Sequence, residues 1–329
     1  MRIAGLLVVA SLALGGVPIR GASAPQIFQP VLLAFDPTQD RLYVTVSIEE
    51  GSRSKLVLIS NPERDGGTKL SSFDLPGVAS GLSYDSDSGT LFAGNSSGHE
   101  LLIFDHIDPS SMGSPTRILK RFAFPTGVYA DASGNRLFVL DAHPGSLRMF
   151  GRSNSVQGEQ QPDLLLSGHE SGLNGPFAIT ADPAHGHLYV SNFDGVLIFN
   201  LRNLSAPPDR LPLPPGTLAR GLSFDAKNAR LYIAAPMAKS FFIYDGTKAR
   251  RVKVRGAEGT FPFSVAVDSE HGRLYLAGTE PQVGVIALRG PDLDPGTAEL
   301  SVDRWIRLDG EAPSPFEHPA PQAPPDGVS

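Results

Sequence analysis

Three histidines, His99, His143 and His169, are the side chains of this sequence with the clearest potential for chemistry. A set of three histidines that leaves one coordination position open can hold zinc and activate a bound water molecule. The three residues lie far apart in the sequence, and no close spacing such as His-x3-His supports a metal site. The alternative interpretation is that they lie in separate exposed loops and share no role. Only the fold can decide between the two.

The composition of the chain excludes several other kinds of chemistry. Its 329 residues include no cysteine, which rules out disulfides, thiol catalysis and cysteine-ligated zinc or iron–sulfur sites. The 35 glycines and 29 prolines predict a turn-rich protein without long helices. Without residues 1–24, which hold two arginines and no acidic residue, 26 basic and 34 acidic residues remain, a net charge of −8. This charge argues against nucleic acid as a partner, because phosphate is bound mainly by basic side chains.

The first residues have the features of a secretory signal. Arg2 supplies the positive charge, residues 3–14 form an apolar run, and Ala22–Ala24 offers the small residues of a cleavage site. Pro18 interrupts the segment before it reaches the ~20 apolar residues of a membrane-spanning helix. We expect a signal peptide over residues 1–24, cleaved there or one residue earlier. We therefore expect export to the periplasm or the outside of the cell, with no transmembrane segment in the mature chain.

One pattern occurs six times along the chain: an aspartate, followed six positions later by leucine and then by tyrosine or phenylalanine. The six aspartates are Asp36, Asp85, Asp131, Asp182, Asp225 and Asp268. They follow one another at intervals of about 46 residues, and repeats of this length with strand-rich content mark β-propellers with one blade per copy. We predict an all-β fold, a six-bladed β-propeller with four-stranded antiparallel blades, over residues 25–310. A proline-rich disordered tail is expected over residues 311–329.

Each copy of the pattern predicts the strands of one blade. Large apolar residues one and three positions before the aspartate alternate with a small residue, which indicates an inner strand that lies close to a neighbouring blade. Runs such as 42–44 are apolar on both faces, as expected for a strand between two blades. The aspartate itself can accept backbone N–H bonds in the turn that follows, which gives it a structural role. Weaker outer strands are expected to end in proline, at 122–125 and 210–214.

Two segments compete to complete the last blade and close the ring. Residues 26–30 are similar to the end of an outer strand and can close it from the N-terminal side. Residues 301–308, which include the single tryptophan, Trp305, can close it from the C-terminal side. Either solution removes an exposed sheet edge.

The recurring Leu-Tyr-Val motif, as in Arg41–Thr45 and His187–Asn192, resembles the YVTN and NHL families of β-propellers. The resemblance covers residues 30–308 and extends to the wider group of TolB-like and gluconolactonase-like propellers. That group includes binding scaffolds, calcium-dependent lactonases and a zinc-dependent lyase. The resemblance therefore implies the fold and leaves the function open.

The lactonases in this group imply a particular set of calcium ligands. Their pattern has a glutamate early in the first blade, followed by two asparagines and an aspartate from later blades. Asn95, Asp141 and Asn192 can stand for the later ligands, whereas the first blade offers only Glu49 and Glu50, in a loop without the Glu-Gly-Pro motif. Asp141 has an alternative role as a side chain that holds its own loop.

In a propeller, the hairpins between second and third strands and the connections between blades meet at one mouth of the central channel. Loops on such a rigid scaffold commonly carry function. The candidate ligand-binding residues in or beside these loops are Asn95, His99, Asp141, His143, His169 and Asn192. We expect an exported monomer that binds a protein or a small molecule at this mouth without a metal. The alternative is a metal-dependent hydrolase or lyase, similar to the lactonases, with calcium or zinc at the mouth.

Overall fold

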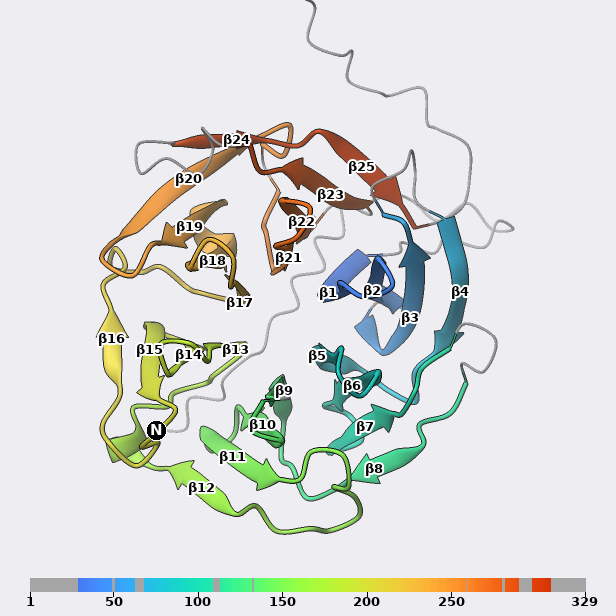
Figure 1. The fold of residues 1–329 in the computed structure, drawn as a ribbon, viewed down its shortest axis with the longest axis vertical. Helices are drawn as coiled ribbons and strands as arrows, with labels where there is room; N and C mark the ends of the chain where they lie inside the picture. Colours follow the sequence, from blue (N-terminus) through green and yellow to red (C-terminus); the bar gives the residue numbers. More distant parts are fainter. Residues whose placement is uncertain are drawn as a thin grey trace, which may run out of the picture.

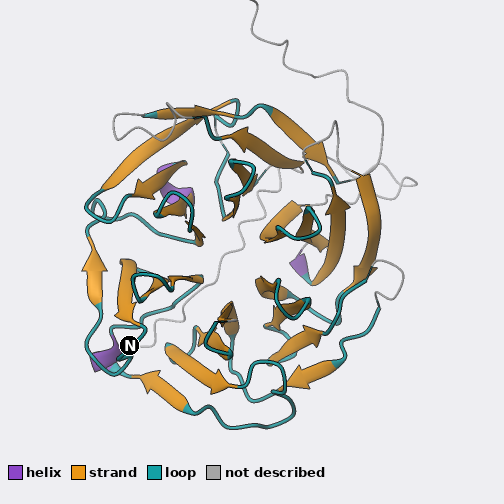
Figure 2. Ribbon diagram, viewed as in Figure 1, coloured by secondary structure: helices purple, strands orange, loops and turns teal. Residues whose placement is uncertain are grey.

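A computed structural model describes residues 29–48, 51–62, 68–108, 113–131, 133–258, 260–279, 282–289 and 298–308. These residues form six β-sheets placed around a central axis (Figure 1). Within the described ranges, the helical structure consists of short 3-10 turns (Figure 2). This confirms the predicted all-β, six-bladed propeller. The predicted signal peptide and C-terminal tail lie outside the described residues.

Each blade is an antiparallel sheet whose strands follow one another in chain order from the channel outwards. Blade 1 contains β1 (Gln29–Asp36), β2 (Arg41–Ile48), β3 (Arg53–Ser60) and β4 (Thr68–Asp74). Blade 2 contains β5 (Ala79–Asp85), β6 (Thr90–Asn95), β7 (Glu100–Phe104) and β8 (Arg117–Leu119). Blade 3 contains β9 (Pro125–Asp131), β10 (Arg136–Asp141), β11 (Ser146–Gly151) and β12 (Leu164–Ser167). Blade 4 contains β13 (Ile179–Asp182), β14 (His187–Asn192), β15 (Gly195–Asn200) and β16 (Asp209–Leu211). Blade 5 contains β17 (Gly221–Asp225), β18 (Arg230–Ala235), β19 (Ser240–Tyr244) and β20 (Ala249–Arg255). Blade 6 contains β21 (Ser264–Asp268), β22 (Arg273–Ala277), β23 (Gln282–Ala287) and β25 (Arg304–Arg307).

The leucine–aromatic pair of each copy explains how neighbouring blades hold together. In β2, both Leu42 and Tyr43 are fully buried. Leu42 packs in a cluster with Val283 of the last blade, whereas Tyr43 packs in a cluster with Leu91 of the next blade. Successive side chains of a strand point to opposite faces, so one apolar pair serves both neighbours. Burying each such side chain contributes about 1.5–3 kcal/mol.

The six repeated aspartates stabilise the turn between the first and second strands. All six are buried. Asp36 accepts hydrogen bonds from the backbone N–H groups of Thr38, at 2.9 Å, and Gln39, at 3.3 Å. Asp268 accepts equivalent bonds from Glu270 and His271, both at 3.1 Å. The structural role predicted for these residues is confirmed.

The inner strands approach one another closely because small residues face the neighbouring blade. A Cβ atom added to Gly81 in β5 would lie 2.4 Å from the backbone oxygen of Thr126 in β9. In β17, the hydroxyl of Ser223 accepts a hydrogen bond of 3.1 Å from the backbone N–H of Val267 in β21. The small residues therefore bring neighbouring inner strands together, as the sequence predicted.

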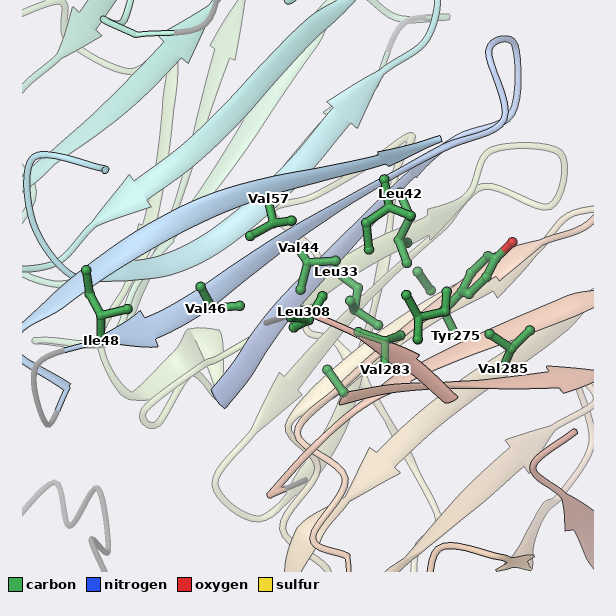
Figure 3. Packing of buried hydrophobic residues seen from close by; sticks show 14 residues of the cluster. Leu33, Leu42, Val44, Val46, Ile48, Val57, Tyr275, Val283, Val285 and Leu308 are labelled. Atoms are coloured by element: carbon green, nitrogen blue, oxygen red, sulfur yellow. The ribbon is translucent and has the colours of Figure 1, made fainter. Parts of the chain in front are cut away.

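The C-terminal segment closes the ring. Strand β25 pairs with β23 and forms the fourth strand of the last blade, whereas Gln29 and Pro30 belong to β1, the first strand of blade 1. The predicted closure of the last blade by residues 26–30 is therefore wrong for Gln29 and Pro30. Residues 26–28 lie outside the described part. Figure 3 shows the side chains that join the first and last blades, among them Leu42 and Val283.

Two features of the outer strands differ from the prediction. Residues 122–125 do not form an outer strand, because β8 completes blade 2 and Pro125 begins β9. Phe122 is buried in the core between blades 2 and 3, so its apolar character serves the packing of a connection. A proline is tolerated as the first residue of a strand, where its missing N–H costs little. An additional strand, β24 (Glu299–Ser301), pairs in parallel with β20 of blade 5 and was not predicted.

Candidate binding face

One face of the ring carries the hairpins between second and third strands and the connections that enter each blade. We call it the mouth face; its described segments are 51–52, 75–78, 96–99, 120–124, 142–145, 168–178, 193–194, 212–220, 236–239, 256–258, 260–263 and 278–279. Backbone hydrogen bonds tie the two kinds of segment together. Ala142 N donates to Phe124 O at 2.9 Å, and Phe193 N donates to Asn174 O at 3.0 Å. The loops are therefore anchored on the blades beneath them.

Asn95 ends β6 and is almost fully buried. Its amide nitrogen donates to Pro76 O, at 3.3 Å, and to Glu100 Oε1, at 3.1 Å. Its amide oxygen accepts hydrogen bonds from the Ser97 hydroxyl, at 3.0 Å, and from Gly98 N, at 3.1 Å. The side chain thereby fixes its own hairpin to the connection that enters blade 2.

Asp141 is the last residue of β10, the position in blade 3 that corresponds to Asn95 in blade 2. Its carboxylate is fully buried and accepts hydrogen bonds from Ala123 N, at 2.8 Å, and Phe124 N, at 2.6 Å. Arg148 forms an ion pair with it at 3.0 Å. These contacts support the alternative in which Asp141 holds its own loop.

Asn192 repeats this arrangement in the next blade, at the end of β14. It accepts a hydrogen bond from Asn174 N at 2.7 Å and donates to Gly172 O at 3.0 Å and to Asp194 at 2.8 Å. Three successive blades thus use the last residue of the second strand to fix the mouth loops. Ligand binding through Asn95, Asp141 and Asn192 stays a prediction, and in the structure their polar atoms bond to the protein itself.

The three candidate histidines lie on separate loops of the mouth face. His99 has its Nδ1 atom 2.6 Å from Ala123 O. The ring of His143 packs edge-on against Phe124, with 6.1 Å between ring centres, and His169 begins the short 3-10 turn η2 (His169–Ser171). Among the described residues, no three His, Asp or Glu side chains form a group that can hold a metal ion. The three histidines therefore do not form the zinc site of the alternative interpretation. The calcium set of that interpretation includes asparagines and Glu49 or Glu50, and these two glutamates lie outside the described part.

Large apolar side chains are exposed on two neighbouring hairpins of the mouth face. Phe193, between β14 and β15, is 62% exposed, and Met237, in the 3-10 turn η3 (Pro236–Ala238), is 68% exposed. The other large hydrophobic residue exposed in the described part is Leu165, at 54%, on the outer strand β12. Isolated exposed hydrophobic residues are common on proteins, but a cluster of them marks an interaction site.

Arg220 lies between the strands that carry these two hairpins. Its backbone N–H donates to Ala234 O in β18 at 2.9 Å, and its carbonyl accepts a hydrogen bond from the Ser191 hydroxyl in β14 at 3.3 Å. The centre of its guanidinium group is 3.7 Å from the centre of the Phe177 ring. Burial lowers the pKa of the Arg220 guanidinium. The mouth face thus carries a cation on the connection between blades 4 and 5, the two blades whose hairpins expose Phe193 and Met237.

The sequence indicates that the hairpins between second and third strands lie at the mouth, but it does not single out Phe193, Met237 or Arg220. Phe193 and Met237 could have been found from the sequence, because large apolar residues are unusual in tight hairpins. For Arg220 the signal is its register: it precedes Asp225 by five positions, as Phe177 precedes Asp182. Residues at the same repeat position of two adjacent blades can contact each other where the blades meet.

A shallow cavity of about 180 Å³ lies at the opposite face, and His185, His187, Arg202 and Asp209 contribute to its walls. His185 is fixed by Asp182, whose Oδ2 atom is 2.6 Å from the histidine Nδ1. The cavity combines side chains of both charge signs and has no large exposed apolar group. It offers less for recognition than the mouth face.

Comparisons with known proteins bear on the fold. The sequence matches no protein-family model, and no curated protein matches it. A chain from the crystal structure of a nidogen/laminin complex is similar in structure, with a TM-score of 0.55 and 17% sequence identity over 75% of this chain and 89% of that one. No helix in the described ranges is long and apolar enough to cross a membrane. At this identity the likeness concerns the fold alone: the chain is a six-bladed β-propeller.

Proposed function

We propose that this protein is an exported binding module that takes another protein on its mouth face, at the hairpins of blades 4 and 5. The observation that carries the proposal is the exposure of Phe193 and Met237 on neighbouring hairpins of that face. Burying two such side chains against a partner contributes about 1.5–3 kcal/mol each. Aromatic and methionine side chains are also enriched in protein interfaces.

The anchoring of the mouth loops supports this function. Asn192 fixes the hairpin of Phe193 to the connection at 172–174. The turn that carries Met237 is held by Arg251, which donates hydrogen bonds to the Ser240 hydroxyl, at 2.8 Å, and to Ala238 O, at 2.5 Å. Loops that are already ordered lose little conformational entropy on binding, which favours affinity.

Two further points are consistent with a secreted binding protein. The first residues of the sequence have the pattern of a signal peptide, and the chain contains no cysteine that oxidation outside the cytoplasm could affect. The similar solved structure is that of a complex between two proteins, nidogen and laminin. Fold likeness is only an analogy for function. The alternative is a metal-dependent hydrolase or lyase; among the described residues, no three His, Asp or Glu side chains form a group that favours it.

The test compares three forms of the full chain: wild type, Phe193→Ser/Met237→Ser and Leu165→Ser. Leu165 is the matched control, because it is also a large apolar side chain that is more than half exposed, at 54%, but lies on the outer strand β12. Each form is immobilised and exposed to the secreted fraction of the source organism, and bound proteins are quantified by mass spectrometry. We expect a partner recovered equally by wild type and Leu165→Ser, and at least about tenfold less by the double variant, a loss of about 1.4 kcal/mol. Equal recovery by all three forms, or no partner for wild type, contradicts the proposal.

A further inference from the structure

The outer strand β12 (Leu164–Ser167) has a free edge. It forms the rim of blade 3 and, among the described strands, pairs with β11 alone. The backbone N–H and C=O groups along such an edge are a template for pairing with another strand. Leu164 and Leu166 pack against the core between blades 3 and 4, whereas Leu165, which points to the opposite face of the strand, is 54% exposed. β12 therefore presents both an open edge and an exposed apolar side chain.

β12 also lacks the charges that the other outer strands carry. Charged residues on an edge strand oppose its pairing with other chains. Each of the other outermost strands in the described part has at least one charged residue: Asp74 in β4, Arg117 in β8, Asp209 in β16, Glu299 in β24 and Arg304 in β25. The sequence of β12 is Leu-Leu-Leu-Ser, without a charge. Among these edges it is the one that nothing protects.

Two other blades show that their outer edges accept an additional segment. In blade 5, β24 pairs in parallel with β20. In blade 2, Gly158 forms a parallel bridge with Leu119 of β8. The N–H of Gly158 donates to Ile118 O at 2.6 Å, and its carbonyl accepts a hydrogen bond from Lys120 N at 2.7 Å. Within the described ranges no segment covers β12 in this way, so its edge can take a strand from another molecule.

We propose that β12 pairs with the β12 strand of a second copy of this chain, antiparallel and around a twofold axis at Leu165. In this register Leu165 lies opposite Leu165 of the second copy, and Leu164 lies opposite Leu166, so all three pairs are apolar. Opposite residues of an antiparallel pair project from the same face and contact each other, so the two exposed Leu165 side chains cover one another. Twofold dimers, in which both copies use the same surface, are the commonest oligomers.

The residue before the strand favours the antiparallel arrangement. Asp163 directly precedes β12. A parallel pair in register would place the two Asp163 carboxylates side by side, and like charges opposite each other destabilise a strand pair. The antiparallel pair instead places Asp163 opposite the neutral Ser167 of the second copy. The edge is therefore complementary to itself in one orientation.

The dimer differs from the monomer expected from the sequence and goes beyond the proposed function. The edge of β12 belongs to blade 3, whereas Phe193 and Met237 lie on hairpins of blades 4 and 5. A strand of 4 residues offers a small contact, and stable interfaces bury about 1,200–2,000 Å². We therefore expect a weak dimer that forms at high protein concentration.

Sedimentation equilibrium of the full chain, from micromolar to near-millimolar concentration, measures the association. The variants Leu165→Lys and Leu165→Glu each place two like charges opposite each other in the proposed pair. An equimolar mixture of these variants tests the register, because opposite charges then face each other. Phe193→Ser/Met237→Ser is the matched control, since it removes the other large apolar side chains that are exposed in the described part.

We expect wild type and the mouth-face double variant to dimerise with equal dissociation constants. Leu165→Lys and Leu165→Glu alone should weaken dimerisation at least about tenfold, and their mixture should restore a dimer with one copy of each. Circular dichroism checks that both variants fold. If they do not, hydrogen–deuterium exchange of wild type decides: the amides of residues 163–167 should exchange more slowly at high than at low protein concentration.

A wild-type chain that stays monomeric at every concentration overturns the inference, as does a dimer that Leu165→Lys leaves unchanged. A mixture of the Lys and Glu variants that stays monomeric contradicts the pairing of Leu165 with itself. Loss of the dimer in Phe193→Ser/Met237→Ser alone would place the contact on the mouth face and also overturn the inference. Failure of the proposed function looks different: the double variant then captures the same proteins as wild type, whether or not the chain dimerises.

Discussion

The backbone N–H of Leu33 in β1 donates a hydrogen bond of 3.2 Å to the hydroxyl of Ser264 in β21, 231 residues further along the chain. This bond joins the inner strands of the first and last blades. The apolar side chains of the same two blades pack beside it (Figure 3). The four main strands of each blade come from one stretch of sequence, and the ring is closed by this hydrogen bond and by side-chain packing between blades. The stability of the ring therefore depends on the last blade being complete.

Replacing Ile306 by alanine should destabilise the protein by about 2–5 kcal/mol. Ile306 is buried in β25 and packs in the cluster that joins blades 1 and 6, so the change leaves a cavity at the point of closure. The free energy of unfolding in urea measures the effect. Leu165→Ala, in the exposed outer strand β12, serves as the control and should change it by less than about 0.5 kcal/mol. Equal stability of both variants would show that residues 304–307 do not close the ring.

Replacing Asp141 by alanine should cost about 3–5 kcal/mol, because the partly buried Arg148 loses its ion-pair partner. The double variant Asp141→Ala/Arg148→Met should recover part of this loss, since the uncompensated charge is then gone. Urea unfolding of the two single variants and the double variant gives the coupling energy between the residues. Additive losses would contradict the ion pair as a structural element of the mouth face.

Replacing Gly81 by alanine should destabilise the protein by about 1–3 kcal/mol through overpacking. The added Cβ would lie 2.4 Å from the backbone oxygen of Thr126, which cannot move without shifting β9. Gly113→Ala is the matched control, because no atom lies within 4 Å of its added Cβ. Thermal unfolding followed by circular dichroism compares the two. A stable Gly81→Ala variant would mean that the inner strands are farther apart than described.

The stability of the protein in acid should depend on Asp105. Hydrogen bonds from Arg117, at 2.7 Å, and Thr116, at 2.8 Å, lower the pKa of this carboxyl in the folded protein. An unfolded aspartate has a pKa of about 3.9. Below that pH the unfolded chain takes up a proton that the folded one does not, so the stabilisation is complete above it and is lost as the pH falls through the folded pKa.

The free energy of unfolding, measured from pH 6 down to pH 2, should therefore fall less steeply for Asp105→Asn than for wild type. Asp87→Asn is a control, since Asp87 is an exposed aspartate of a neighbouring turn. Parallel curves for wild type and Asp105→Asn would exclude the contribution of Asp105.

The sequence predicted the blades because each blade repeats the same local physics. The turn bonds of Asp36 involve Thr38 and Gln39, two and three positions away, and the burial of Leu42 and Tyr43 follows from a strand between two sheets. Such rules need no knowledge of distant contacts. The sequence left the closing segment open between residues 26–30 and 301–308, and the pairing of β24 with β20 is not specified by the residue pattern of either strand.

The candidate site was harder to predict, because polar residues beside a loop can serve either a ligand or the loop itself. Asn192 has the amide expected of a ligand, yet it bonds to Asn174, Gly172 and Asp194. The arrangement of Phe177 and Arg220 joins residues of two blades, and their shared repeat position became meaningful only once the ring was known.

The central claim, that a partner binds the mouth face at blades 4 and 5, is tested most directly by hydrogen–deuterium exchange on the complex with the captured partner. The segments 172–178, 191–195, 217–222 and 234–240 should exchange more slowly in the complex than in the free protein. The turns at the opposite face, such as 183–187 and 226–230, should exchange at the same rate in both. Protection of the opposite turns, with unchanged exchange around Phe193, Arg220 and Met237, would contradict the account.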